Sequence, residues 1–226
     1  MALIHDNLAL VKSKIAEAAR RSRRLPESVE LIAVSKTFPV ESIQKAYDAG
    51  QRVFGENRPQ EMLTKTPGLP KDVRWHLIGP LQSNKVRKVL PVAAAIHSVA
   101  SVDTARTIQR ISTELQVTTK IFLEVNVAGE ASKFGFAPAD LESTLEAVLN
   151  MDRLDIQGLM CVPPIVDEPE ESRKHFIFLR EKRDQLEPRF GIKLPSLSMG
   201  MSGDYQVAVE EGATHVRVGS AIFGHR

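Results

Sequence analysis

Leu31-Ile32-Ala33-Val34-Ser35-Lys36 is an apolar β-type run that ends on a lysine, and it is the stretch from which the fold can be inferred. Two glycine-bearing segments lie near the other end of the chain, Ser198-Met199-Gly200-Met201-Ser202-Gly203 and Arg217-Val218-Gly219-Ser220. If the strands between them close into a barrel, the first and last strands become neighbours and the lysine meets both segments at one mouth. An amine beside a phosphate-binding turn suits a phosphorylated aldehyde, because the amine can form a Schiff base while backbone N–H groups bind the anion.

Short β-type runs alternate with helical patterns along the whole chain. The expected strands cover residues 30–35, 52–55, 74–79, 95–99, 120–127, 155–161, 196–200 and 214–218. This alternation indicates right-handed βαβ units and a parallel sheet, and eight strands are the number that closes a (β/α)8, or TIM, barrel. A doubly wound open sheet is the alternative architecture, but no strand is followed by G-x-G-x-x-G. We therefore expect an α/β protein built as a single (β/α)8 barrel domain over residues 1–226.

An amphipathic helix is expected before the first strand. Its apolar positions, which recur with a 4-3-4-3 spacing typical of one helix face, are Ile4, Leu8, Val11, Ile15 and Ala18. We expect residues 1–24 to form this extra helix and to pack on the barrel. Further helical patterns cover residues 43–50, 101–111 and 141–148, a long charged helix opens at Pro169, and a short helix is expected around residues 221–223.

Charge and cysteine content exclude several classes of protein. Lys and Arg number 30 against 28 acidic residues, and this near balance argues against a dedicated nucleic-acid-binding protein. The single cysteine, Cys161, leaves no internal disulfide and no Cys-rich zinc site, and we expect a packed thiol. No stretch is long and apolar enough for a membrane span, and the first residues lack a signal-peptide pattern. We expect a cytoplasmic protein that binds neither nucleic acid nor membrane.

A barrel would place the binding site at the C-terminal ends of its strands, where the loops after strands seven and eight commonly hold phosphate. Both glycine-bearing segments follow these strands. Gly219 would let backbone N–H groups approach an anion, and Ser202 and Ser220 could donate hydroxyl hydrogen bonds. Ser198 and Met201 belong to the same segment as Ser202. Each segment alone could be an ordinary turn, but two of them at the expected positions favour a phosphate site.

Two cations in these strands suggest further contacts with the ligand. Lys36 shares strand parity with Ile32 and Val34, so we expect its amine inside the mouth. Partial desolvation and nearby cations would lower the lysine pKa there, whereas a solvent-facing charge is the alternative. Arg217 lies within an apolar run, so its guanidinium should face an anion or a ring acceptor in the mouth. An arginine on the ring nitrogen of pyridoxal phosphate would disfavour protonation of that nitrogen and weaken the cofactor as an electron sink.

Two more residues are candidates for the pocket. Asn57 follows the second expected strand and could reach a ring hydroxyl from there. His76 either lines the pocket or is a satisfied core histidine. The other histidines show no H-E-x-x-H or similar spacing, so we expect no metal site. The sequence contains neither a G-x-S-x-G elbow nor a P-loop.

Several segments, in this order, resemble the pyridoxal phosphate homeostasis protein family, also called the YggS/PROSC family. They are Ala33-Val34-Ser35-Lys36-Thr37, Phe54-Gly55-Glu56-Asn57, the highly specific Trp75-His76-Leu77-Ile78-Gly79-Pro80-Leu81-Gln82-Ser83-Asn84-Lys85, Ser132-Lys133-Phe134-Gly135, Gly158-Leu159-Met160, Leu197-Ser198-Met199-Gly200-Met201-Ser202 and Arg217-Val218-Gly219-Ser220-Ala221-Ile222-Phe223-Gly224. The last segment also resembles the R-P-G-I-x-L-Y-G run of alanine racemases, whose barrel domain this family shares. Arg58-Pro59 departs from the family pattern of tyrosine and a small apolar residue, which alters the edge of the site.

The resemblance implies a barrel of the alanine racemase N-terminal type, with pyridoxal 5′-phosphate as the cofactor and Lys36 carrying the internal aldimine. It further implies a monomer without robust catalysis, which acts in vitamin B6 homeostasis by buffering the cofactor or delivering it to apo-enzymes. A regulatory partner and indirect effects on amino and keto acid balance also belong to this expectation. With the inferences above, the expected cofactor-binding residues are Lys36, Asn57, His76, Ser198, Met201, Ser202, Arg217, Gly219 and Ser220.

An enzyme remains the alternative, either an amino-acid racemase that uses pyridoxal phosphate or a Schiff-base lyase on a phosphorylated substrate. Racemases of this fold use an additional β-domain that supplies a catalytic tyrosine. The only tyrosines here, Tyr47 and Tyr205, lie in helical patterns, so no second base for proton transfer is visible and we assign no catalytic residue. Lys85 and Lys133 could accept cofactor in transit or contact a partner, or they are ordinary solvated lysines.

Overall fold

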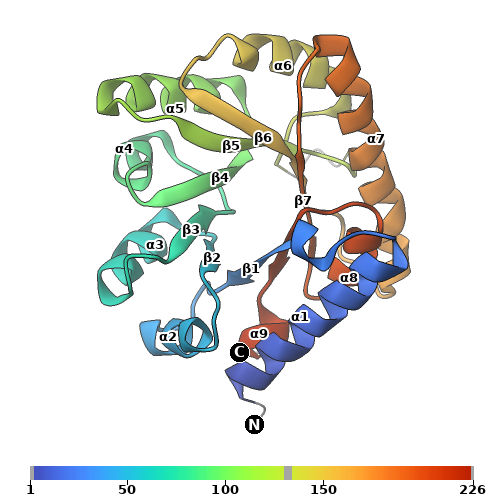
Figure 1. Ribbon diagram of the computed structural model, residues 1–226. Coiled ribbons are helices and arrows are strands. Elements are labelled where there is room, and N and C mark those ends of the chain that lie inside the picture. The colour runs from blue at the N-terminus through green and yellow to red at the C-terminus, as the bar shows by residue number, and fades with distance from the viewer. Residues whose placement is uncertain (1–2, 130–133, 225–226) are drawn as a thin grey trace.

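A closed parallel β-barrel surrounded by helices forms the body of the protein (Figure 1). The computed structural model describes residues 3–129 and 134–224. The strands are β1 (Glu30–Val34), β2 (Val53–Glu56), β3 (Arg74–Leu77), β4 (Ala93–Val99), β5 (Thr119–Val125), β6 (Leu154–Cys161), β7 (Ser196–Met201) and β8 (His215–Val218). Each strand pairs with the next in chain order, and β1 pairs in parallel with β8 to close the ring. The predicted (β/α)8 fold is confirmed, and each strand lies where the sequence predicts one.

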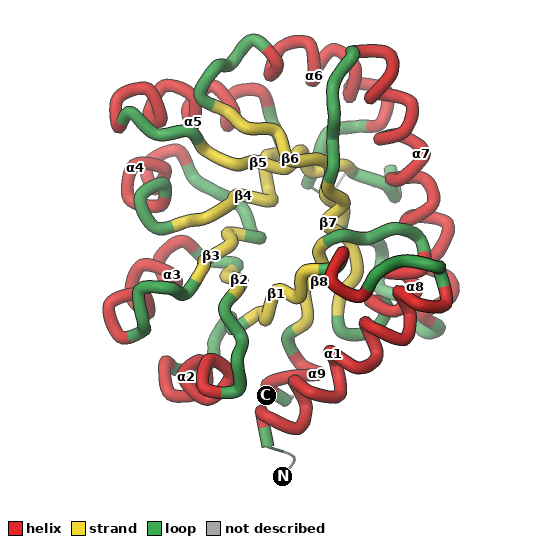
Figure 2. The backbone as a smooth tube through the Cα atoms, in the orientation of Figure 1, coloured by secondary structure: helices red, strands yellow, loops and turns green. Residues whose placement is uncertain are grey.

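Helices form an outer ring around the strands (Figure 2). They are α1 (Ile4–Arg21), α2 (Val40–Asp48), α3 (Pro59–Lys65), α4 (Val86–Val89), α5 (Val102–Leu115), α6 (Leu141–Leu149), α7 (Arg173–Phe190), α8 (Tyr205–Glu210) and α9 (Ser220–Phe223). The sequence patterns miss α3 and α4. The long charged helix begins at Arg173 and not at Pro169, because Pro169–Ser172 form a 3-10 turn before it. No helix within the described part of the chain is long and apolar enough to cross a membrane.

Strand β1 shows why the strands read as continuous apolar runs. Leu31 and Ala33 belong to the hydrophobic core between barrel and helices. Ile32 and Val34 face the interior instead, where their methyl groups lie 2.8 and 3.5 Å from the position of a Cβ added at Gly55. Both faces of the strand are therefore buried, as is usual for a parallel sheet covered by helices.

Helix α1 buries the predicted apolar stripe and packs against α2, α8 and α9 (Figure 1). It ends at Arg21, three residues before the predicted boundary. Arg23 adopts a left-handed backbone with φ of 57°, and the Arg24 amide N–H then donates to the Ala19 carbonyl at 2.8 Å. This turn stops the helix in the manner of an αL cap.

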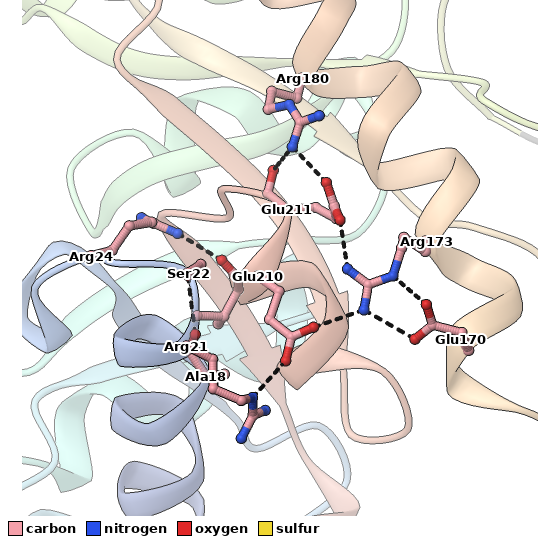
Figure 3. Close-up of polar contacts among 10 residues, drawn as sticks. Ala18, Arg21, Ser22, Arg24, Glu170, Arg173, Arg180, Glu210 and Glu211 are labelled. Atoms are coloured by element: carbon pink, nitrogen blue, oxygen red, sulfur yellow. Dashed lines mark hydrogen bonds and ion pairs between the residues drawn. The ribbon is translucent and has the colours of Figure 1, made fainter.

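An ion-pair network joins α1, α7 and α8 on the outside of the barrel (Figure 3). Glu210 of α8 accepts from Arg21 at 2.8 Å and from Arg173 at 2.7 Å. Glu211 accepts from Arg173 and Arg180, each at 2.5 Å. The extra N-terminal helix is thus tied to the helix that precedes β8.

We predict that Gly158→Ala will destabilise the barrel severely. A Cβ at Gly158 would lie 1.8 Å from the carbonyl oxygen of Ser196 on β7, and its φ of +155° suits glycine. Relief requires strands β6 and β7 to separate, so we expect urea unfolding to show a loss of about 3 kcal/mol or more. Gly203→Ala is the matched control, because a Cβ there meets nothing within 4 Å. Equal stabilities for the two variants would contradict this account.

Candidate functional site

A cavity of about 620 Å³ opens where β1, β2, β7 and β8 end, and we call it the first cavity. Seven residues of the predicted site line it: Lys36, Asn57, Met201, Ser202, Arg217, Gly219 and Ser220. They come from four loops or strand ends that are distant in sequence. Barrel closure therefore brings the lysine and both glycine-bearing segments to one mouth.

Lys36 lies in a turn two residues beyond the end of β1. Val34, the last residue of the strand, lines the first cavity, in agreement with the predicted parity. The Lys36 side chain is exposed, whereas the sequence suggested partial burial. The next residue, Thr37, has a left-handed backbone with φ of 66°, which is uncommon for a β-branched residue and requires support from its surroundings.

An ion cluster lies next to this turn, and we call its three residues, Glu56, Glu61 and Lys65, the anchor cluster. Glu56 and Lys65 are buried and Glu61 is half-buried. Glu56 is the last residue of β2, and the other two lie on α3. Lys65 Nζ is 2.8 Å from Glu56 Oε1 and 3.1 Å from Glu61 Oε2. Burial raises the pKa of Glu56, while hydrogen bonds from Lys65 and Ser35 oppose that rise.

The anchor cluster holds both neighbours of Lys36. Ser35 Oγ donates to Glu56 Oε1 at 2.7 Å, and Lys65 Nζ donates to the Ser35 carbonyl at 3.0 Å. The Thr37 amide N–H donates to Glu61 Oε2 at 2.7 Å. The backbone on each side of Lys36 is therefore fixed, although the side chain itself is exposed. Sequence reasoning missed this cluster, because nothing in the residue spacing links it to Lys36.

Donor groups converge on the Ser202 hydroxyl, which also lines the first cavity. The amide N–H groups of Gly219 and Ala221 point to Ser202 Oγ, at 3.1 and 3.5 Å. A Cβ at Gly219 would lie 3.2 Å from the carbonyl oxygen of Val34, so glycine lets this turn approach β1 closely. Convergent N–H and hydroxyl donors of this kind suit an anion such as a phosphate.

Arg217 is buried inside the barrel, and the structure shows how its charge is accommodated. The guanidinium donates at 2.7 Å to the Ser198 carbonyl, to Ser198 Oγ and to the Cys161 carbonyl. The expectation that it must face an anion or ring acceptor is thus incomplete, because three neutral oxygens already accept from it. Arg217 also lines the first cavity and is held there in a fixed orientation.

His76 and Ser198 lie beneath the first cavity and are not among its lining residues. They belong to a buried series of hydrogen-bonded side chains that begins at Arg217. Ser198 Oγ is 2.8 Å from His97 Nδ1, and His97 Nε2 is 2.8 Å from His76 Nδ1. Because Arg217 can only donate, Ser198 Oγ accepts from it and can donate its own O–H to His97 Nδ1. Their role in ligand binding stays a prediction; in the structure they support Arg217.

His97 was missed by the sequence reasoning, although its place in the strand 95–99 gave a signal. Burial lowers the pKa of His76 to about 3 and that of His215 to about 4. Burial also puts the pKa of His97 well below its ordinary value. The three imidazoles inside the barrel are therefore neutral near pH 7.

Other candidates lie away from the first cavity. Cys161 ends β6 fully buried, and burial raises the pKa of its thiol to about 12, which fits the expected packed thiol. The Tyr47 hydroxyl donates to Asp72 at 2.6 Å, and Tyr205 is buried at the start of α8. Lys85 does not line the first cavity, and Lys133 lies outside the described residues. The described residues contain no group of three or more His, Cys, Asp or Glu side chains that could hold a metal ion.

Comparisons with known proteins agree on one family. Residues 7–226 match the family model of the alanine racemase N-terminal domain. The pyridoxal phosphate homeostasis proteins of Pseudomonas aeruginosa and Aquifex aeolicus are 44% and 40% identical, over 100% and 98% of this chain and 97% of each relative. The structure of PipY from Synechococcus elongatus, solved with PLP bound, is 42% identical with a TM-score of 0.82, and the match covers 93% of this chain and 100% of PipY.

We predict that Lys65→Met will destabilise the protein, because it leaves the buried Glu56 carboxylate without its cation. Breaking a buried pair in this way typically costs about 3–5 kcal/mol, which urea unfolding can measure. Lys45→Met, on the exposed face of α2, should change stability little. Adding Glu56→Gln to Lys65→Met should recover part of the loss. No recovery would mean that the unpaired carboxylate is not its cause.

We also predict acid sensitivity from the buried histidines. The unfolded chain takes up protons on histidine near the ordinary pKa of 6.5, whereas folded His76 and His215 do so only near 3 and 4. The free energy of unfolding that depends on these histidines should thus be fully present above pH 6.5. It should fall as the pH drops toward 4, by up to about 1.4 kcal/mol per pH unit for each histidine.

The test is urea unfolding at several pH values between 7 and 4.5. His76→Gln should make the pH slope shallower by up to about 1.4 kcal/mol per unit. His5→Gln, at an exposed position on α1, should leave the slope unchanged. Equal slopes for the wild type and His76→Gln would show that His76 does not resist protonation in the folded state.

Proposed function

Because this chain belongs to the pyridoxal phosphate homeostasis protein family, we propose that it binds pyridoxal 5′-phosphate (PLP) and buffers the cofactor or delivers it to apo-enzymes. The observation that carries the proposal is the meeting of Lys36 with the donors around Ser202 at one mouth. PLP has both an aldehyde and a phosphate, the two groups that such a lysine and such donors can hold. Effects on amino and keto acid balance would then be indirect, through supply of the cofactor.

The residues of the first cavity fit PLP in chemical type. Gly219, Ser202 and Ser220 would hold the phosphate through N–H and hydroxyl donors, and Lys36 would hold the aldehyde as a Schiff base. The Asn57 side chain would reach the ring hydroxyl. The backbone of Asn57 can take this position because residue 79 is glycine: a Cβ added at Gly79 would lie 2.2 Å from the Asn57 carbonyl oxygen.

Arg217 would influence how strongly the bound ring withdraws electrons. When bound, PLP supplies an aldehyde for attachment and a ring that can withdraw electrons. A guanidinium is a donor only, so Arg217 beside the ring nitrogen would keep that nitrogen unprotonated and weaken electron withdrawal. The three hydrogen bonds to Ser198 and Cys161 would hold the guanidinium in place. This arrangement supports a carrier more than a catalyst of carbanion chemistry.

A carrier is also supported by the side chains around the first cavity. Lys36 and Arg217 are the only ionisable groups among its described lining residues. Proton transfer on both faces of a substrate needs a second acid or base opposite the lysine, and neither Tyr47 nor Tyr205 lines this cavity. We therefore propose a non-catalytic role. A monomeric state, a cytoplasmic location and a regulatory partner stay predictions from the sequence.

We predict that purified protein with PLP will show a visible Schiff-base band, which borohydride will bleach. Peptide mapping should then find the reduced pyridoxyl group on Lys36. Lys36→Ala should abolish the band and the adduct and weaken PLP binding by roughly tenfold or more, since the covalent bond is lost. Lys85→Ala is the control and should retain both.

Two results would contradict the proposal in different ways. A colourless protein that fails to take up added PLP would exclude cofactor binding and favour a Schiff-base lyase on a phosphorylated substrate. Sustained racemisation of an amino acid that is lost in Lys36→Ala would show an enzyme. The carrier proposal requires PLP uptake without such turnover.

A further inference from the structure

A second cavity of about 520 Å³ adjoins the first. The two share Asn57, Ile78 and Val162 as walls, and the second cavity extends toward the ends of β3, β4 and β5. None of the predicted cofactor-binding residues other than Asn57 lines it. Its lining is mainly apolar and contains one acidic side chain, Glu124.

Glu124 faces the second cavity from inside the barrel. It has the same strand parity as Phe122, which packs on His97 in the interior. Glu124 is only 9% exposed, and its carboxylate has no hydrogen-bond or ion-pair partner in the parts of the chain that the structure describes. Arg217 carries the nearby positive charge, but its hydrogen bonds go to Ser198 and Cys161.

A carboxylate in this position favours a cationic ligand. Burial raises the pKa of Glu124, and Arg217 opposes that rise. A carboxylate in a largely desolvated place is stabilised by an opposite charge, which an ammonium group that enters the cavity would supply. The other buried glutamate near the mouth, Glu56, already pairs with Lys65. Of the two, Glu124 is therefore the one that could pair with a cationic ligand.

The lining residues also favour an amine over an amino acid as the ligand. Glu124 is the only charged side chain among the described residues of the second cavity, so none of these residues offers a cation to a carboxylate. Helix α5 begins beside the cavity, but Ser101 Oγ already accepts from the Thr104 amide N–H at 3.1 Å. Ile78 and Leu81 provide apolar walls for a short hydrocarbon chain.

We propose that the second cavity binds a small primary amine without a carboxylate, with Glu124 receiving the ammonium group and the apolar walls receiving the hydrocarbon. The bound amine would lie beside the mouth that carries Lys36. The inference rests on the proposed function in one respect: it names a ligand for the cavity next to the proposed cofactor site. Binding itself requires no PLP.

The test is calorimetric titration of cofactor-free protein with isobutylamine, valine and isobutanol. Valine adds a carboxylate to the same hydrocarbon, and isobutanol lacks the charge. We expect isobutylamine to bind at least tenfold more tightly than either, and Glu124→Gln to weaken its binding at least tenfold. Glu146→Gln removes an exposed carboxylate from α6 and should change nothing.

Isobutylamine that does not bind at all, or that binds equally to wild type and Glu124→Gln, would overturn the inference. So would valine or isobutanol binding as tightly as the amine. Tighter binding of Nα-acetyl-lysine methylamide would assign the cavity to a lysine of a partner protein and would also overturn it. If Glu124→Gln fails to fold, Ala100→Phe fills the cavity from another strand end and should abolish binding of the amine.

Uptake of PLP by the same preparations, followed by absorbance, separates the two proposals. Amine binding without PLP uptake would refute the proposed function alone. PLP uptake without amine binding would refute the inference alone.

Discussion

Pairing of β1 with β8 is the interaction on which the site depends. The register runs from Glu30 opposite His215 to Ala33 opposite Val218, and it brings the two ends of the chain to one edge of the barrel. The turn at Gly219 then lies so close to β1 that a Cβ would be 3.2 Å from the Val34 carbonyl oxygen. An open sheet would leave the lysine and the anion-binding donors on separate strands.

The barrel interior is unusually polar for a fold whose centre is commonly filled by branched aliphatic side chains. Its polar groups divide into two kinds. Arg217, Ser198, His97 and His76 satisfy one another through a continuous set of hydrogen bonds, so they need no ligand to remain buried. Glu124 has no such partner among the described residues, which makes it the interior group whose burial a ligand would improve.

Sequence reasoning reached the barrel because strands that are buried on both faces read as short apolar runs, and eight of them close. It also predicted that Asn57 and Ser202 lie at the same mouth, where both line the first cavity, since position after a strand determines the edge of the barrel. Helix α4 was missed because a helix of four residues shows no stripe. The anchor cluster was missed for another reason: its contacts join separate strands and helices, and no local pattern encodes them. His97 lay in a predicted strand, but its contacts to Ser198 and His76 on other strands could not be read from that position.

A lysine that captures a ligand has to be both accessible and well positioned, and these demands conflict, because exposure removes packing contacts that would position a side chain. The chain meets both by fixing the neighbours of Lys36. The left-handed backbone at Thr37 costs of the order of 1–3 kcal/mol. Hydrogen bonds to charged groups contribute about 1.5–3 kcal/mol each, and the Thr37 N–H and Ser35 hydroxyl both donate to carboxylates. The anchor cluster can therefore offset the strain and hold the turn while leaving the amine at the mouth.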